Sequence, residues 1–221
     1  MNKSTLALAV AVGVMAQQAG AAGFIEDSKA TLGLRNFYIN TDNRDNNTKA
    51  AGAQNKQEEW GQGFIGTFES GFTEGTVGFG ADAIGMFGFK LDSGDGTAGS
   101  GLLVPDNSSG GSQDNYSDLA VAAKAKISNS TLRVGQMQFK NAAIASSDSR
   151  LLPQVFEAGH LVSQEIDGLM LEAAHVREVN NRNSSDYEDI SVTNSFNSTR
   201  GTVGTRGIRL SGGSTTDAFD F

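Results

Sequence analysis

Positively charged side chains alternate with apolar ones between residues 116 and 135. Lys124, Lys126 and Arg133 fall on one face of this pattern. The opposite face carries small or apolar residues, which are Leu119, Val121, Ala123, Ala125, Ile127, Leu132 and Val134. Ammonium and guanidinium groups in a low-dielectric passage attract anions, and a guanidinium can bind a carboxylate through two parallel hydrogen bonds. The chemistry that these residues indicate is the binding or guidance of small anions.

Arg35 is a basic residue of the same kind in an earlier segment. Leu32 and Leu34 share the face opposite to it. The alternation then slips at 36–37, which predicts a β-bulge there. For each of these basic residues the alternative is an ordinary solvated charge, or a lysine that reaches toward lipid headgroups.

Residues that could support catalysis or hold a metal ion are few. The chain has no Cys and two His, which excludes thiolate sites and disfavours a histidine-rich metal site. The Gly-x-Gly triplets at 61–63, 78–80 and 94–96 lack the strand–helix context of a nucleotide site. The acidic segment 92–96 lacks the bidentate Glu of a calcium loop. We therefore expect no enzyme activity and no cofactor.

The overall composition excludes several classes of protein. The 221 residues include 17 Lys and Arg against 25 Asp and Glu, giving a net charge of −8, which argues against nucleic acid as a partner. There are 28 Gly and only 2 Pro, a pairing that disfavours collagen-like segments and suits strands with close backbone approaches.

The first segment has the features of an export signal. Lys3 supplies a positive charge and residues 6–16 form an apolar stretch, which is too short for a transmembrane helix of about 20 residues. Small residues at 19 and 21 then fit a signal-peptidase site. We predict a signal peptide at 1–22 of an exported bacterial protein, the alternative being a short buried helix.

Period-2 alternation recurs along the rest of the chain, and no run of 18 apolar residues occurs. It predicts an all-β, antiparallel fold with strands at 29–39, 58–70, 75–91, 116–127, 131–135, 154–163 and 167–177. Weak alternation in segments of about ten residues is typical of a transmembrane β-barrel.

The connections between these strands alternate between short and long. Short ones are expected at 71–74, 128–130 and 164–166, and long ones at 41–57, 92–115, 140–153 and 179–216. Loops of this length are unusual in a soluble domain. Outer-membrane barrels combine short periplasmic turns with long extracellular loops, so residues 23–221 are interpreted as part of such a barrel.

Several motifs resemble the OprD-type substrate-specific porins of pseudomonads. They lie, in order over the mature chain, at 23–38, 59–64, 71–79, 148–153, 165–169 and 182–185. The resemblance implies an antiparallel barrel of about 18 strands. It also implies an inward-folded third extracellular loop and a ladder of Arg and Lys along the lumen.

Arg150 stands in the motif 148–153, which resembles the constriction loop of that family. The resemblance implies that 151–153 wedge against the wall, with Arg150 and Asp148 facing the pore. Ser146 and Ser147 would add neutral hydrogen bonds. A salt bridge within the loop is an equally compatible interpretation.

His175 stands where the resemblance implies an Arg. A neutral imidazole would weaken anion guidance above about pH 6.5. The alternative is an ordinary, partly buried His.

Family members are about twice as long as this chain. We predict seven full strands and the start of an eighth at 217–221, and therefore an N-terminal portion of a barrel or a truncated reading frame.

These observations predict a passive outer-membrane channel for small carboxylates or basic amino acids. Expected partners are anionic or zwitterionic solutes and outer-membrane lipid, and the sequence leaves a homotrimer open. The alternatives are a secreted or surface-attached β-rich adhesion protein and a non-functional porin fragment.

Overall fold

The alternating segments form long strands. The computed structural model describes residues 22–42, 55–94, 96–106, 108–192, 210–212 and 218–221. A short helix, α2 (Ala22–Glu26), precedes the sheet. The strands are β1 (Lys29–Asp42), β2 (Lys56–Glu69), β3 (Gly78–Asp92), β4 (Asn115–Ile127), β5 (Ser130–Met137), β6 (Val155–Ile166), β7 (Leu169–Asn180), β8 (Tyr187–Val192), β9 (Leu210–Gly212) and β10 (Phe219–Asp220). No helix in these ranges is long and apolar enough to cross a membrane.

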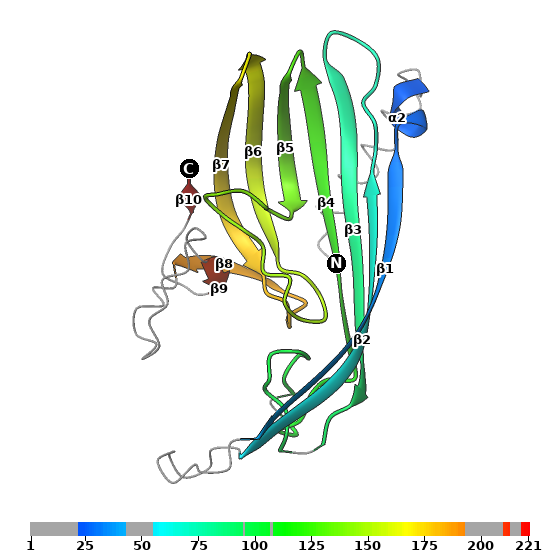
Figure 1. Ribbon diagram of the computed structural model, residues 1–221, viewed down its shortest axis with the longest axis vertical. Helices are drawn as coiled ribbons and strands as arrows, with labels where there is room; N and C mark the ends of the chain where they lie inside the picture. Colours follow the sequence, from blue (N-terminus) through cyan, green and yellow to red (C-terminus); the bar gives the residue numbers. More distant parts are fainter. Residues whose placement is uncertain (1–21, 43–54, 95, 107, 193–209, 213–217) are drawn as a thin grey trace.

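Strands that follow one another in the sequence are neighbours in the sheet. The order runs from β1 to β9, every pairing is antiparallel, and β10 pairs with β7 beside β8. Figure 1 shows the sheet curving along its width. This arrangement is the wall of an up-and-down barrel, of which β1 to β7 form a continuous part.

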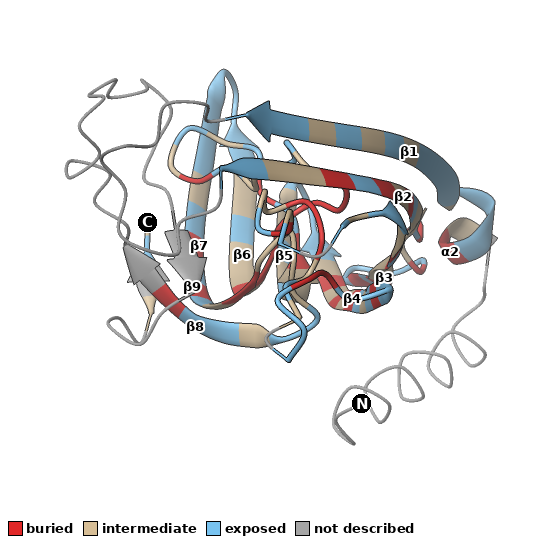
Figure 2. Ribbon diagram, turned by 90° about the horizontal axis from the view of Figure 1, so that it is seen from below, coloured by how far each residue is buried: buried red, intermediate tan, exposed pale blue. Residues whose placement is uncertain are grey.

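The connections at the two ends of the sheet differ in length. At the upper end in Figure 1 the turns are short, covering residues 70–77, 128–129 and 167–168. At the lower end the connections 93–114 and 138–154 are long. These two long connections lie inside the curve of the sheet when it is viewed from their end (Figure 2). The side that they cover is called the inner face below.

The two faces of the sheet differ in polarity because successive side chains point to opposite sides. Leu32 and Leu34 on β1 are 69% and 66% exposed on the outer face. Phe87 and Leu119 continue this exposed apolar surface on β3 and β4. An apolar outer face matches the lipid-facing wall of a transmembrane barrel.

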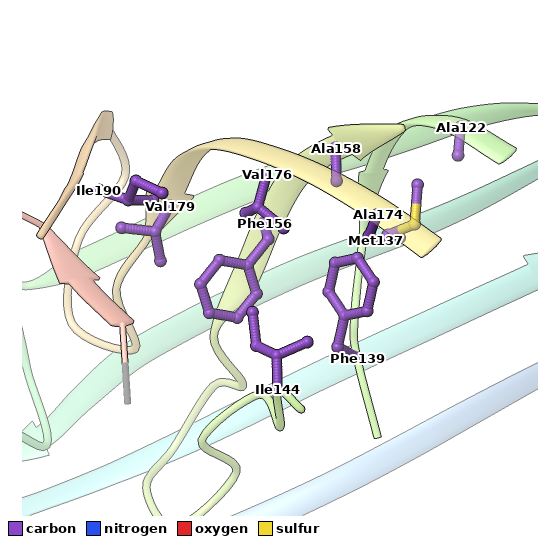
Figure 3. Close-up of a cluster of buried hydrophobic side chains, with 10 residues drawn as sticks. All are labelled: Ala122, Met137, Phe139, Ile144, Phe156, Ala158, Ala174, Val176, Val179 and Ile190. Carbon is purple, nitrogen blue, oxygen red and sulfur yellow. The ribbon is translucent and has the colours of Figure 1, made fainter. Parts of the chain in front are cut away.

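The buried residues form two clusters on the inner face. One gathers around Phe156, where Phe139 and Ile144 of the 138–154 connection point toward β6 and β7 (Figure 3). The other joins Leu102 and Leu103 of the 93–114 connection to Leu151 and Leu152 of the 138–154 connection. The long connections therefore supply much of the apolar surface that packs on the inner face.

Two sequence predictions about local structure are wrong. No bulge occurs at 36–37, because β1 pairs with β2 in regular register from Lys29 to Asp42, and the shift lies at Trp60/Gly61 instead. The turn expected at 164–166 is Asp167–Gly168, where Gly168 has a φ of 75°. An Asp-Gly pair is a strong turn signal, since glycine accepts positive φ without strain.

The expected long loop at 179–216 includes regular structure. β8 pairs with the end of β7, and β9 pairs with β8. Within residues 217–221, where an eighth strand was expected to begin, β10 pairs with Val176 and His175 of β7. The predicted signal peptide at 1–22 lies outside the described residues, except for Ala22.

Candidate functional site

Lys124 and Arg133 are direct neighbours across β4 and β5. Ala120 and Ala122 lie on the same face as Lys124 and are buried, whereas Leu119 on the opposite face is 55% exposed. The alternation therefore brings both cations to the inner face.

The ammonium group of Lys124 is buried under the turn 70–77. Its Nζ donates hydrogen bonds of 2.6 Å to the Ser70 carbonyl oxygen and to Asp82 Oδ1. The Phe72 ring lies 5.0 Å from the same atom. The side chain is 5% exposed, so Lys124 anchors the turn and offers little charge to a solute.

Lys126 and Arg133 are the accessible cations of this region. Lys126 is exposed, with its Nζ 5.8 Å from the centre of the Phe72 ring. Arg133 is 42% exposed and its Nε lies 3.5 Å from Asp82 Oδ2. Asp82 therefore partly neutralises both Lys124 and Arg133, and the sequence analysis missed it. The alternation of β3 could have identified it, because Asp82 falls opposite Ala81 and Ala83.

Arg35 connects β1 to the 138–154 connection. Its Nη1 donates hydrogen bonds to Asp148 Oδ1 at 2.7 Å and to the Arg150 carbonyl oxygen at 2.6 Å. Phe37, two residues along β1, faces the same way and packs against the cluster around Leu151. Arg35 is thus on the inner face, where its guanidinium holds the connection by charge-assisted hydrogen bonds.

The 138–154 connection packs directly against β2 at Gly63. Leu151 is fully buried, and a Cβ added to Gly63 would lie 3.0 Å from the Leu151 carbonyl oxygen. Pro153, like Leu152, is buried. Glycine at 63 leaves room for this close approach of two backbones.

The polar residues of the 138–154 connection each have a different hydrogen-bond partner. Asp148 is exposed and pairs with Arg35. The Ser146 hydroxyl accepts a hydrogen bond from the Phe139 N–H at 3.0 Å. Ser147 pairs with Gln154 through its backbone, with the Gln154 N–H donating to the Ser147 carbonyl oxygen at 2.8 Å. Ser146 is thus engaged within the connection.

Arg150 has no carboxylate partner among the described residues. Its Nη1 donates to the neighbouring Ser149 carbonyl oxygen at 2.9 Å. Its Nε is buried and has no hydrogen-bond partner among the described residues. Arg182 reaches the same place from the segment after β7, donating to Ser149 Oγ at 2.7 Å. Arg35 and Arg182 therefore contact the single segment 148–150, to which Arg150 itself belongs. Sequence analysis included Arg182 in the motif 182–185 but gave it no role, because it lies in a connection without periodicity.

His175 does not lie with these cations. It is on the outer face of β7, opposite the buried Ala174 and Val176, and its Nδ1 is 2.5 Å from Asp220 Oδ1. The expectation that His175 replaces an Arg along the inner face is wrong, because the register of β7 directs it outward.

Known proteins are similar to this chain in sequence and in fold. Residues 22–217 match the family described as outer membrane porin, OprD family. The porin-like protein GalP of Pseudomonas putida is 40% identical over 175 residues, which are 79% of this chain and 41% of GalP. Porin D of Pseudomonas aeruginosa is 42% identical over 187 residues, which are 80% of this chain and 40% of Porin D.

Solved structures agree with the sequence matches. OccK9 (OpdG) of Pseudomonas aeruginosa superimposes with a TM-score of 0.76 at 43% identity, covering 90% of this chain and 46% of OccK9. OpdK of the same species, solved with vanillate, gives a TM-score of 0.66 at 42% identity, covering 76% of this chain and 40% of OpdK. The chain spans about two fifths of the length of the curated relatives it matches. With its curved antiparallel sheet, apolar outer face and inward-folded connections, the chain belongs to the OprD family of outer membrane porins.

Proposed function

We propose that this chain contributes the wall and the constriction of an outer-membrane diffusion channel for small carboxylates or amino acids. The observation that carries the proposal is the gathering of three arginines at residues 148–150, where Arg35 and Arg182 contact the segment that contains Arg150. They lie on the inner face of a sheet whose outer face is apolar. Membership of a porin family favours a channel over the adhesion protein considered above.

The proposed mechanism needs no bond chemistry and no catalytic residue. A solute carboxylate loses part of its hydration at the constriction, and fixed guanidinium groups replace the lost water contacts. Arg150 is the best placed to do so, because it has no carboxylate partner among the described residues. Lys126 and Arg133 extend the positive charge along the inner face toward the short turns.

The ligand in the solved structure of one relative supports carboxylates as the class of solute. Vanillate, present in the OpdK structure, carries a carboxylate. We extend a carboxylate preference to this chain because its inner face presents accessible guanidinium groups. In the same proposal the long connections lie on the extracellular side and the short turns on the periplasmic side, as in other barrels of this type. A homotrimer stays a prediction, which chemical cross-linking in outer membranes would check.

Ion selectivity of the barrel that contains this chain tests the proposal. In planar bilayers, Arg150→Gln and Arg133→Gln should each lower the anion-to-cation permeability ratio and the current carried by benzoate. Lys140→Gln, an exposed residue at the start of the 138–154 connection, is the matched control. A permeability ratio that stays constant in both arginine variants would refute the mechanism.

A further inference from the structure

Glu59 is a fully buried carboxylate for which the channel mechanism has no use. It lies on β2 opposite Ile39 of β1 and is 0% exposed. No Lys or Arg in the described ranges forms an ion pair with it. Burying an unpaired carboxylate is costly unless several donors satisfy its oxygens. Its surroundings should therefore reveal what the charge does.

Three donors meet Glu59, and all of them come from the 93–114 connection. The Ser100 N–H donates to Oε2 at 2.9 Å, and the Ser100 hydroxyl donates to the same oxygen. The Ser112 hydroxyl donates to Oε1 at 2.5 Å. The two serines lie on either side of Leu102 and Leu103, which are fully buried. A single carboxylate thus fixes both ends of the segment that carries these leucines.

The position of Glu59 along β2 explains why it meets this connection. β3 pairs with β2 only up to Trp60, beyond the register shift at Trp60/Gly61. Beyond this point the 93–114 connection lies along the edge of β2 that β3 leaves unpaired. There the Glu58 N–H donates a hydrogen bond to the Thr97 carbonyl oxygen at 2.8 Å. Figure 1 shows this connection in green beside the lower ends of β2 and β3. Glu59 then points from β2 into the space that the connection encloses.

The 93–114 connection in turn contacts the 138–154 connection, which carries Arg150. A Cβ on Gly61 would lie 3.0 Å from Leu103 Cδ2 and 2.8 Å from Leu151 Cδ2. Both leucines therefore pack against the same point of β2 and belong to one buried cluster. Leu151 directly follows Arg150, whose backbone carbonyl Arg35 binds.

We propose that Glu59 is a positioning residue of the channel. It holds the 93–114 connection on the inner face, and through Leu103 and Leu151 it fixes where Arg150 presents its guanidinium. This role rests on the proposed function, because positioning Arg150 matters only if solutes pass it. Glu59 contacts no solute itself.

A thiol-reporter experiment tests the first step without depending on transport. The chain contains no Cys, so Ala98→Cys, at a position that is 5% exposed in the 93–114 connection, introduces the one thiol of this chain, and any Cys elsewhere in the barrel is first replaced by Ser. In isolated outer membranes, adding Glu59→Leu should raise the rate of labelling by a membrane-impermeant maleimide by about tenfold or more, since one charge-assisted hydrogen bond corresponds to at least that factor. Glu59→Gln should stay near the parent rate, because its amide oxygen can accept from Ser100 while its NH2 donates to Ser112.

The control is the neighbouring residue. Glu58 has the same charge on the opposite face of β2, where Lys56 and Tyr38 contact it. Glu58→Leu should leave the labelling rate unchanged. If Glu59→Leu prevents assembly, Ser112→Ala removes one donor with a smaller change and should also raise labelling. Unchanged labelling in both Glu59→Leu and Ser112→Ala overturns the proposal.

Bilayer currents test the second step. Glu59→Leu should lower the benzoate current and increase its fluctuations, and Glu59→Gln should restore both. Raised labelling with an unchanged benzoate current overturns the positioning role, provided that Arg150→Gln lowers that current. If the parent barrel carries no current at all, the proposed function fails and the positioning role fails with it, while the labelling rates still report whether Glu59 holds the connection.

Discussion

Arg35 on β1 and Asp148 on the 138–154 connection form an ion pair of 2.7 Å, although 113 residues separate them in the sequence. The same Nη1 atom of Arg35 also binds the Arg150 carbonyl oxygen. One side chain of the wall thus fixes the connection at two points. Asp148 partly neutralises Arg35, whereas Arg150 forms no ion pair among the described residues, which is why the proposed mechanism relies on Arg150.

Removing the charge of Asp148 should make the channel more selective for anions. Asp148→Asn keeps the shape of the side chain, while Arg35 stays bound to the Arg150 carbonyl. We expect the anion-to-cation permeability ratio, measured from reversal potentials across a salt gradient, to rise roughly twofold, in line with the modest strength of exposed pairs. Asp167→Asn removes the same charge at an exposed turn and should leave the ratio unchanged. A permeability ratio that does not rise in Asp148→Asn would contradict the conclusion that Asp148 partly neutralises the charge of Arg35.

The two lysines of β4 should respond differently to substitution. Lys124→Met leaves Asp82, whose side chain is 17% exposed, with Arg133 as its remaining ion-pair partner among the described residues, which should destabilise the folded barrel by roughly 3 kcal/mol. Lys126→Met, at an exposed position, should change stability by less than about 0.5 kcal/mol and lower anion permeability instead. The temperature at which each variant loses its heat-modifiable gel migration measures stability. Equal temperatures for the two variants would show that Lys124 is not an anchor.

A methyl group on Gly63 should displace the 138–154 connection. The added Cβ would lie 3.0 Å from the Leu151 backbone oxygen, which cannot move without the connection. We expect Gly63→Ala to raise proteolytic cleavage of the connection in intact outer membranes several-fold. Gly66→Ala is the matched control, since its nearest neighbour would be 3.9 Å away. Resistance to cleavage equal to that of the parent barrel would contradict the close packing.

The turn around Asp106 should keep its carboxylate ionised in acid. Hydrogen bonds from Ser108, then Ser109, hold the pKa of Asp106 at about 2, below its usual value of 3.8. Because the folded-state pKa is lowered, the stabilisation is present above the unfolded value and is lost as the pH falls through about 2. An NMR titration of the Asp106 side chain should give this midpoint, and Ser108→Ala should shift it upward. A midpoint near 3.8 in the parent chain would contradict the turn geometry.

Alternation predicted the strands and their faces because it is a local property. Leu119 and Lys124 fall on opposite faces in the sequence and in the structure, since each successive residue reverses direction. Ser128 and Asn129 form a hairpin turn, within the predicted 128–130. The Asp167–Gly168 turn was missed although its signal is local, because the predicted strand 167–177 included the Asp-Gly pair.

Burial of individual charges could not be predicted in the same way. Lys124 is covered by Ser70 and Phe72, which belong to a distant turn. Glu58 and Glu59 are identical neighbours, yet only Glu59 is enclosed, because the 93–114 connection folds against one face of β2. Which charges remain accessible depends on where turns and long connections distant in the sequence fold, and the residues near each charge do not encode this.

Gly61 and Gly63 place two leucine-bearing segments directly against the main chain of β2. Because β2 carries no side chain at these two positions, the distance of the two segments from the wall is set by the leucine side chains and by the Leu151 main chain. In the proposed channel, exchanging exposed residues of the two connections would alter which solutes are preferred while this packing against β2 is kept. Solute preference and the width of the constriction would then change independently of each other during evolution.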